Sequence, residues 1–173
     1  MKKVVIADAG PLIALARIGQ LQLLSQLFGE VFLTDVVALE ITTGGVFPDS
    51  QALQNALAQS WLQTVTLPDA SPEACRDWIN LHQIDMGEAS ALVLASQCQA
   101  QGDDVLLVMD ETRGRQAAAH AHIAIIETAG LLILAKNEHL LAAVKPLLAA
   151  LQAQNYFLSA RLLEAVLRQA GEV

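Results

Sequence analysis

The stretch that decides the fold is KVVIADAGPL, residues 3–12, in which an apolar run stops at an aspartate. Residues 3–7 are rich in Val and Ile, which predicts a short buried strand. Asp8 ends this strand. Pro11 then favours a helix, because proline suits the first turn, where a backbone N–H has no partner within the helix. The segment therefore predicts a strand that passes through an acidic residue into a helix.

The same alternation continues along the chain. Further strands are expected at residues 31–33, 61–67, 105–109 and 123–126. Helices are expected at residues 21–28, 35–41, 72–83 and 87–101, from about 114, and from 128 onward with a break near Asn155. Between them we expect a turn at Gly44-Gly45, a loop that leads into a helix over 47–60, and a linker at 68–72. Mostly apolar strands that alternate with helices predict a three-layer α/β/α sandwich with a mainly parallel central sheet. We expect a single domain over residues 1–173.

Composition and charge limit the function. Hydrophobic residues make up 54 % of the chain, yet no apolar run reaches membrane-spanning length and no signal-peptide pattern is present. Cys75 and Cys98 are isolated, so a cytoplasmic protein with reduced thiols is expected. The net charge is −8, and no Lys or Arg lies between Arg17 and Arg76. This distribution counts against broad, non-specific binding of nucleic acid.

Two aspartates follow predicted strands directly. Asp8 and Asp110 should point into the crevice beyond the carboxyl ends of the sheet, where ligands of such folds bind. Glu111 is left as an outer ligand, because adjacent residues leaving a strand tend to point opposite ways. The simpler alternative is that Asp8 is a turn residue and Asp110 a helix cap.

Two glutamates lie among apolar residues. Glu40 stands near the end of its predicted helix, where the helix dipole disfavours an anion, so a bound cation is a natural partner. Glu88 begins a helix that is apolar almost all round and therefore buried. The alternatives are a solvated helix face for Glu40 and, for Glu88, a capping box with Asp85.

Four carboxylates that converge would repel one another unless a cation joins them. Oxygen ligands suit Mg²⁺ or Mn²⁺, and such ions can turn a bound water into a nucleophile. The four histidines show no zinc-like spacing. The residues alone thus favour a metal-dependent hydrolytic site formed by Asp8, Glu40, Glu88 and Asp110.

Several segments resemble the PIN-domain family, in particular its short prokaryotic members. They are residues 6–13, 37–40, 85–89, 109–118, 128–136 and 155–159. The resemblance implies a Mg²⁺- or Mn²⁺-dependent endoribonuclease, often the toxin half of a type II toxin–antitoxin pair, with metal-site carboxylates at Asp8, Glu40, Glu88 and Asp110. Two positions depart from the pattern. Glu111 stands where this branch usually has Asp, which alters the outer metal position, and Gly10 stands where many relatives have a hydroxyl.

Arg113 and Arg115 follow Asp110 closely and are candidates to contact a substrate phosphate. Arginine suits this role because its planar fork pairs with two phosphate oxygens at once. The alternative for Arg115 is an ion pair with Glu111, four residues earlier, worth only about 0.3–0.5 kcal/mol.

The sequence also allows functions other than that of a ribonuclease. One is a non-catalytic module whose acidic surface binds a protein partner such as a basic antitoxin peptide. A phosphatase of the haloacid dehalogenase type would need a second Asp at position 10, which is Gly, and a response-regulator receiver would need a phospho-accepting Asp and a late Lys that are not convincingly present. The excess of apolar helical surface and the family resemblance favour a homodimer, which a monomeric mass in light scattering at micromolar concentration would contradict.

Overall fold

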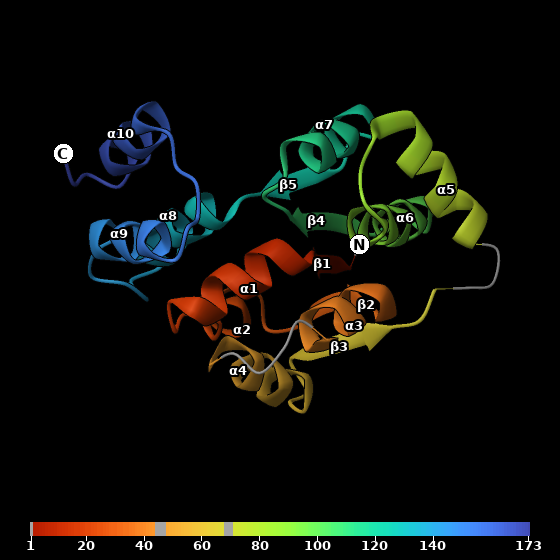
Figure 1. Ribbon diagram of the computed structural model, residues 1–173, viewed down its shortest axis with the longest axis horizontal. Coiled ribbons are helices and arrows are strands. Elements are labelled where there is room, and N and C mark those ends of the chain that lie inside the picture. The colour runs from red at the N-terminus through yellow and green to blue at the C-terminus, as the bar shows by residue number, and fades with distance from the viewer. Residues whose placement is uncertain (1, 44–47, 68–70) are drawn as a thin grey trace.

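The fold is built on an all-parallel sheet. The structure, a computed structural model, describes residues 2–43, 48–67 and 71–173. The described residues form a five-stranded sheet in the order β3-β2-β1-β4-β5 (Figure 1). The strands are β1 Lys3–Ala7, β2 Val31–Thr34, β3 Leu62–Val65, β4 Asp104–Val108 and β5 Ala124–Ile126. All pair in parallel, which confirms the predicted α/β/α class.

The helices occur where the sequence predicted them, although several begin or end at other residues. They are α1 Ala9–Arg17, α2 Leu23–Phe28, α3 Asp35–Thr43, α4 Pro48–Leu57, α5 Ser71–His82, α6 Met86–Ala100, α7 Thr112–His120, α8 Thr128–Asn137, α9 Lys145–Ala153 and α10 Ala160–Gln169. Helix α1 begins before Pro11 and α7 before Gly114. The C-terminal helical region is broken after Asn137 as well as near Asn155, because His139 takes a left-handed conformation that ends α8. The expected Gly44-Gly45 turn and the start of the linker at Pro68 lie outside the described residues.

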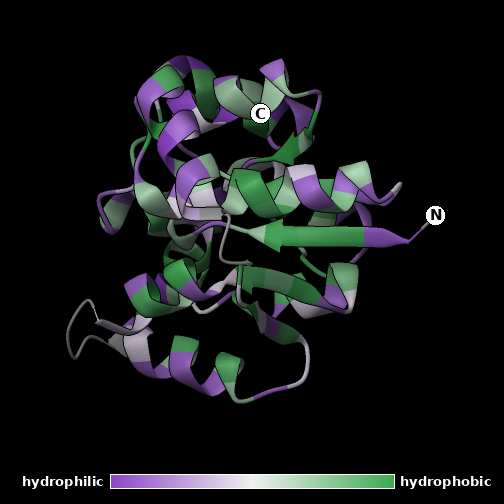
Figure 2. Cartoon of the chain, turned by 90° about the vertical axis from the view of Figure 1, so that its right-hand side faces the viewer, coloured by the Kyte–Doolittle hydropathy of each residue, from purple (hydrophilic) through white to green (hydrophobic). Residues whose placement is uncertain are grey.

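The sheet separates two apolar layers. Val4 and Ile6 of β1 pack with α5, α6 and α7, whereas Val5 and Ala7 pack with α1, α8 and α9 on the other face. This alternation follows from the two-residue period of a strand. In Figure 2, β1 is hydrophobic along its length except at its first residues, as expected for a strand covered on both faces.

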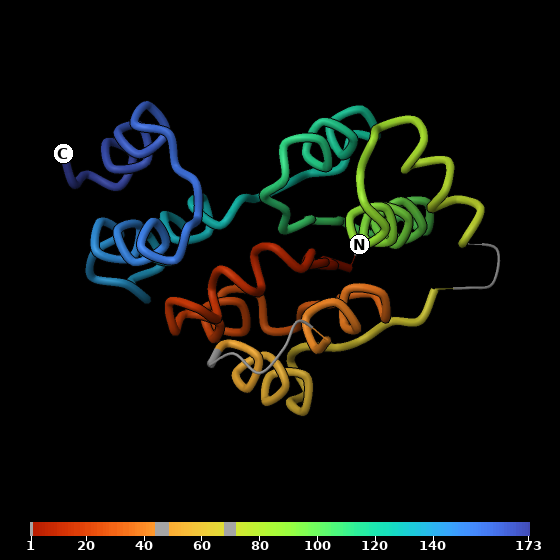
Figure 3. Tube along the Cα trace, in the orientation of Figure 1, coloured from red at the N-terminus to blue at the C-terminus, as the bar shows by residue number. Residues whose placement is uncertain are grey.

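The C-terminal helices form an extension of one layer. Figure 3 follows the chain from β5 across to α8, α9 and α10, which gather at one end of the molecule. Glu172 fastens this end: its carboxylate accepts hydrogen bonds from the backbone N–H groups of Val144 and Lys145 and pairs with Lys136 Nζ at 2.6 Å. Glu172 therefore caps the start of α9 from the end of the chain. Among the described residues, no helix has the length and apolar character needed to cross a membrane.

Strand order fixes where a ligand can bind. From β1 the chain proceeds to β2 and β3 on one side, whereas β4 and β5 lie on the other side of β1. The connections therefore diverge between β1 and β4, which opens a crevice beyond their carboxyl ends. The sequence positions after these two strands are Asp8 and Met109-Asp110-Glu111.

Gly114 is required by close packing of α7 on the end of β4. A Cβ at this position would lie 2.4 Å from Met109 Sδ and 2.6 Å from Glu88 Oε1, and Met109 is fully buried. We expect Gly114→Ala to lower the free energy of unfolding by about 1–3 kcal/mol, the range of an overpacked core. Gly10→Ala is the matched control: a Cβ there meets nothing within 4 Å, so we expect a gain of about 0.5–1 kcal/mol from helix propensity. Denaturant unfolding of both variants measures the contrast, and equal effects would contradict it.

Candidate functional site

Asp8 lies directly after β1, at the switch point between β1 and β4. Its backbone N–H donates to the Val108 carbonyl at 3.0 Å, which continues the β1–β4 ladder by one residue and fixes its position. Its side chain is only 5 % exposed. A carboxylate held at this depth needs a proton, a hydrogen-bond donor or a cation to offset the loss of water.

Gly87, in the first turn of α6, lets three carboxylates from different elements approach one another. A Cβ at Gly87 would lie 2.7 Å from Glu40 Oε2, 3.3 Å from Asp85 Oδ1 and 3.7 Å from Asp8 Oδ1. The three oxygens therefore surround one small volume at the strand ends. Glu40 reaches it from the last turn of α3, although much of its side chain is exposed.

Glu88 serves as a cap and still has an unused oxygen. Its Oε2 accepts from the Asp85 backbone N–H at 2.9 Å, and Asp85 Oδ1 accepts from the Glu88 N–H at 2.8 Å, so the capping box that the sequence allowed is present. Glu88 Oε1 is buried and makes no hydrogen bond of ordinary geometry with the described residues, although the nearby backbone amide of Gly114 lowers the Glu88 pKa somewhat. The cap thus leaves one buried acceptor available.

A chain of hydroxyl groups holds α3 against α6. Thr34 Oγ1 accepts from the Val37 N–H at 3.2 Å, which caps α3, and lies 2.7 Å from Ser90 Oγ. Ser90 Oγ donates its proton to the Gly87 carbonyl at 2.7 Å, so Thr34 must be the donor to Ser90. Both hydroxyls are fully buried. This chain sets the spacing between the helix that carries Glu40 and the one that carries Glu88.

Asp110 faces a different partner at the same edge of the sheet. Its two oxygens accept from the backbone N–H and the hydroxyl of Thr128, each at 2.7 Å, at the start of α8. The Tyr156 hydroxyl also hydrogen-bonds to Asp110; burial and this carboxylate raise the Tyr156 pKa above its usual value. Glu111, in contrast, is among the charges that raise the pKa of Glu88. The structure thus gathers Asp8, Glu40 and Glu88, with Glu111 near Glu88 and Asp110 held toward α8.

Burial and the neighbouring negative charges make Asp8 a weak acid. Burial, followed by the repulsion of Asp85, Glu88 and Glu40, raises the pKa of Asp8 from 3.8 to about 7, against the opposing effect of a backbone hydrogen bond from Ala9. Burial and Asp85 also raise the pKa values of Glu40 and Glu88. The side-chain charges that act most strongly on Asp8, those of Asp85, Glu88 and Glu40, are all negative, so the cluster attracts protons or cations.

The two arginines of α7 reach different neighbouring segments. Arg115 pairs with Glu127, and its Nη2 also lies 3.4 Å from Thr112 Oγ1. The sequence suggested Glu111 as its partner, but only the Arg115 backbone contacts that residue, through the helical hydrogen bond to the Glu111 carbonyl. Arg113 Nη1 donates to the Gln83 carbonyl at 3.1 Å. Both arginines therefore have protein partners, and Arg115 is half-buried.

The donor set of the cluster fits a hard divalent cation in chemical type. All its side chains are carboxylates, and the buried, unpaired Oε1 of Glu88 is an oxygen that a cation would satisfy. Within residues 2–43, 48–67 and 71–173, no three potential ligands already stand at the spacing of a metal centre. Small rotations of exposed side chains such as Glu40 would be needed to bring the oxygens onto one ion.

Some contributors to the site were not anticipated from the sequence. The sequence indicates Asp85 only as a helix cap, yet its charge raises the pKa values of three other acids in the cluster. Its position three residues before Glu88 was the available signal. Thr128 and Tyr156, the partners of Asp110, had no such signal, because they are 18 and 46 residues away in sequence.

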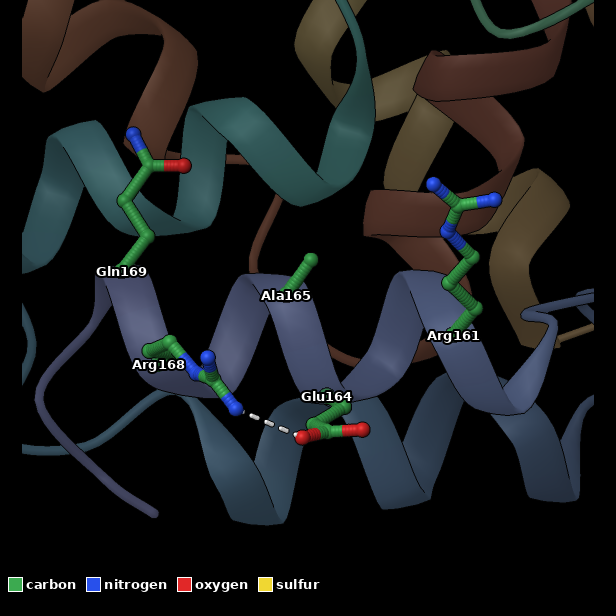
Figure 4. Close-up of a pocket in the computed structure, with 5 residues that line it drawn as sticks. All are labelled: Arg161, Glu164, Ala165, Arg168 and Gln169. Carbon is green, nitrogen blue, oxygen red and sulfur yellow. Dashed lines mark hydrogen bonds and ion pairs between the residues drawn. The ribbon is translucent and has the colours of Figure 1, made fainter.

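Another hollow in the surface lies on α10, away from the acidic cluster. Figure 4 shows Arg161, Glu164, Ala165, Arg168 and Gln169 along it. Arg168 pairs with Glu164 at 2.7 Å on the same helix, and both side chains are well exposed. This arrangement is that of a solvated helix face, where an ion pair of this kind contributes only about 0.3–0.5 kcal/mol.

The fold and the site together define an α/β/α protein with a cluster of carboxylates, two of them buried, at the switch point of a parallel sheet. A family model described as a PIN domain matches residues 4–172, nearly the whole chain. The chain belongs to the PIN-domain family, whose members are generally nucleases that typically use divalent metals. No curated protein and no solved structure gives a significant match.

The raised pKa of Asp8 predicts how stability depends on pH without added metal. Between 3.8 and about 7 the folded chain keeps a proton on Asp8 that the unfolded chain releases. The Asp8 contribution is therefore fully present below 3.8 and is lost as the pH rises through about 7. We expect Asp8→Asn to be more stable than wild type at pH 8 and to show a flatter profile in denaturant unfolding. Asp77→Asn, which removes an exposed charge on α5, is the control; a profile unchanged by Asp8→Asn would contradict the assignment.

Proposed function

We propose that this protein is a Mg²⁺- or Mn²⁺-dependent endoribonuclease that hydrolyses phosphodiester bonds of RNA. The observation that supports the proposal is the gathering of Asp8, Glu40, Glu88 and Asp85 at the sheet's switch point, with Asp8 buried among other negative charges. A structural role alone would not require a buried carboxylate such as that of Asp8 to lie beside several others. Membership of a family that is generally composed of nucleases also supports a nuclease function.

In this proposal, Asp8, Glu40, Glu88 and Asp110 hold the divalent ions and Glu111 serves as an outer ligand. When bound, such an ion stabilises negative charge on a phosphate and lowers the pKa of a coordinated water. Glu88 contributes Oε1 while Oε2 remains in the capping box, so its orientation is preset. Thr128 fixes the orientation of Asp110, whose oxygens retain further lone pairs for a ligand.

The biological setting proposed is that of a toxin in a toxin–antitoxin pair, working as a homodimer. Its net charge of −8 suits the docking of a basic antitoxin peptide. Few cationic side chains are available to bind RNA phosphates, and this favours cleavage of selected RNAs over general degradation. Growth arrest of cells that express the protein, relieved by Asp8→Asn, would support the toxin role. Normal growth of these cells, although the protein cleaves RNA in vitro, would contradict it.

A second candidate is a non-catalytic module that binds a protein partner. It is favoured by the engagement of both Asp110 oxygens with Thr128 and by the absence, among the described residues, of ligands already arranged for a metal. Metal affinity distinguishes the two. A module of this kind would bind its partner equally well with and without Mn²⁺.

Metal binding and cleavage can be tested on the same variants. We expect millimolar Mn²⁺ to raise the unfolding temperature of the wild type, because a ligand that binds only the folded state stabilises it. Asp8→Asn and Asp110→Asn should lose this shift and also lose cleavage of single-stranded RNA, whereas Asp77→Asn keeps both. Calorimetry on the wild type provides the direct measurement. If no Mn²⁺ binding is detected at millimolar concentration, the proposed function fails.

A phosphate contact by Arg115 can be tested separately from cleavage. With Asp110→Asn or Ca²⁺ to prevent turnover, we expect Arg115→Ala to weaken RNA binding and to reduce the salt dependence by one contact, a slope of roughly −0.7 on single strands. The ion pair with Glu127 must open for this role. Arg168→Ala, which removes a paired arginine on α10, is the control. Unchanged affinity and slope in Arg115→Ala would leave Arg115 with a purely structural role.

A further inference from the structure

A groove of about 260 Å³ lies between α1 and the segment that leaves α9. Its α1 side includes Gly10, Ile13 and Arg17, and its other side includes Gln154, Asn155 and Tyr156. Leu151 and Ala14 complete the lining and are buried. The groove thus combines apolar walls, two amide side chains, one aromatic ring and one cation.

The groove begins beside the acidic cluster. Gly10 is two residues beyond Asp8, on the first turn of α1. At the other wall, Tyr156 reaches Asp110 through its hydroxyl group. The groove therefore lies close to two of the carboxylates assigned to the metal site. A strand of RNA positioned for cleavage at those carboxylates would have a neighbouring nucleotide within reach of it.

We propose that this groove is a subsite for one nucleobase of the RNA strand, next to the phosphodiester that is cleaved. The inference rests on the proposed ribonuclease function. Proteins that read single-stranded RNA stack its bases on aromatic and apolar side chains and hydrogen-bond their edges. Ile13 and Tyr156, which are partly exposed, supply the apolar surface, and Gln154 and Asn155 supply amide donors and acceptors.

The charges in the lining also suit a nucleotide. No carboxylate is among the described residues that line the groove, unlike the cluster beside it. Arg17 stands at the rim with its side chain 44 % exposed and its Nε paired with Asp49 at 3.2 Å. The remaining guanidinium donors can meet the phosphate that follows the base. The described lining of the groove thus offers a nucleotide both polar and apolar side chains and no carboxylate.

Gly10 makes the groove accessible to a blocking substitution. It is exposed, and a Cβ there would have no atom within 4 Å, so a longer side chain can enter the groove without disturbing the packing of α1. Gln152 is equally exposed, lies one turn before Tyr156 and is outside the lining. Gly10→Leu and Gln152→Leu therefore form a matched pair that adds the same side chain inside and outside the groove.

The experiment is a titration of the full chain without metal, followed by amide chemical shifts in NMR. The probes are the four nucleoside 5′-monophosphates, with inorganic phosphate as a separate arm. We expect saturable shifts at Gly10, Ala14 and Gln154 that depend on the base. Gly10→Leu should weaken binding at least about tenfold, more than the loss of one weak contact, and Gln154→Ala about fivefold, as for one neutral hydrogen bond. Gln152→Leu and Gln152→Ala should bind as the wild type does.

Three results would overturn the subsite. One is equal shifts from inorganic phosphate and from the nucleotides, which would indicate an anion site only. Another is binding that survives in Gly10→Leu when thermal unfolding shows this variant to be folded. The third is the absence of shifts along the groove. None of these results depends on cleavage. Nucleotide binding without ribonuclease activity would refute the proposed function and leave a nucleotide-binding groove that serves no cleavage reaction. Activity without nucleotide binding would refute the subsite and leave the proposed function in place.

Discussion

Mutual repulsion among carboxylates at the carboxyl ends of β1 and β4 is the constraint on which the rest of this structure depends. Asp8 is buried, and Glu40, Asp85 and Glu88 all disfavour its ionised form. Such a cluster persists only where the surrounding fold is rigid enough to hold it. That rigidity comes from three sources: the β1–β4 ladder that continues through the Asp8 amide, the capping box of α6, and the buried Thr34–Ser90 pair.

Helix α6 links this constraint to the core. Residues 87–95 are buried throughout, so the helix cannot shift to relieve the crowding at its first turn. Gly87 and Gly114 lack the Cβ atoms that would occupy the space now taken by Glu40 and Glu88. The N-terminal end of α6 also favours anions, which partly offsets the repulsion. Stability and the acidic site thus compete at the same few residues, as is common where function requires an unfavourable local arrangement.

The C-terminal helices extend the site beyond the acidic cluster. Thr128 begins α8 and holds Asp110, and Tyr156, which follows α9, joins the same carboxylate. Glu172 in turn ties the chain's end to the start of α9. Through these contacts the segment from residue 154 to 156 comes to face α1 and forms one wall of the groove beside Gly10. The last forty-five or so residues therefore shape the surroundings of the site rather than only covering the sheet.

The sequence alone determined the alternation of strands and helices, the parallel sheet and the capping box, because these depend on residues a few positions apart. Two-residue and helical periodicities and the spacing of Asp85 from Glu88 are local signals. Only the tertiary structure decided that Asp85 joins the cluster, that Asp110 turns toward Thr128, and that Arg115 pairs with Glu127 rather than with Glu111. Such choices depend on which side chains from distant segments meet when the layers pack, and the geometry of neighbouring residues along one helix or strand does not contain that information.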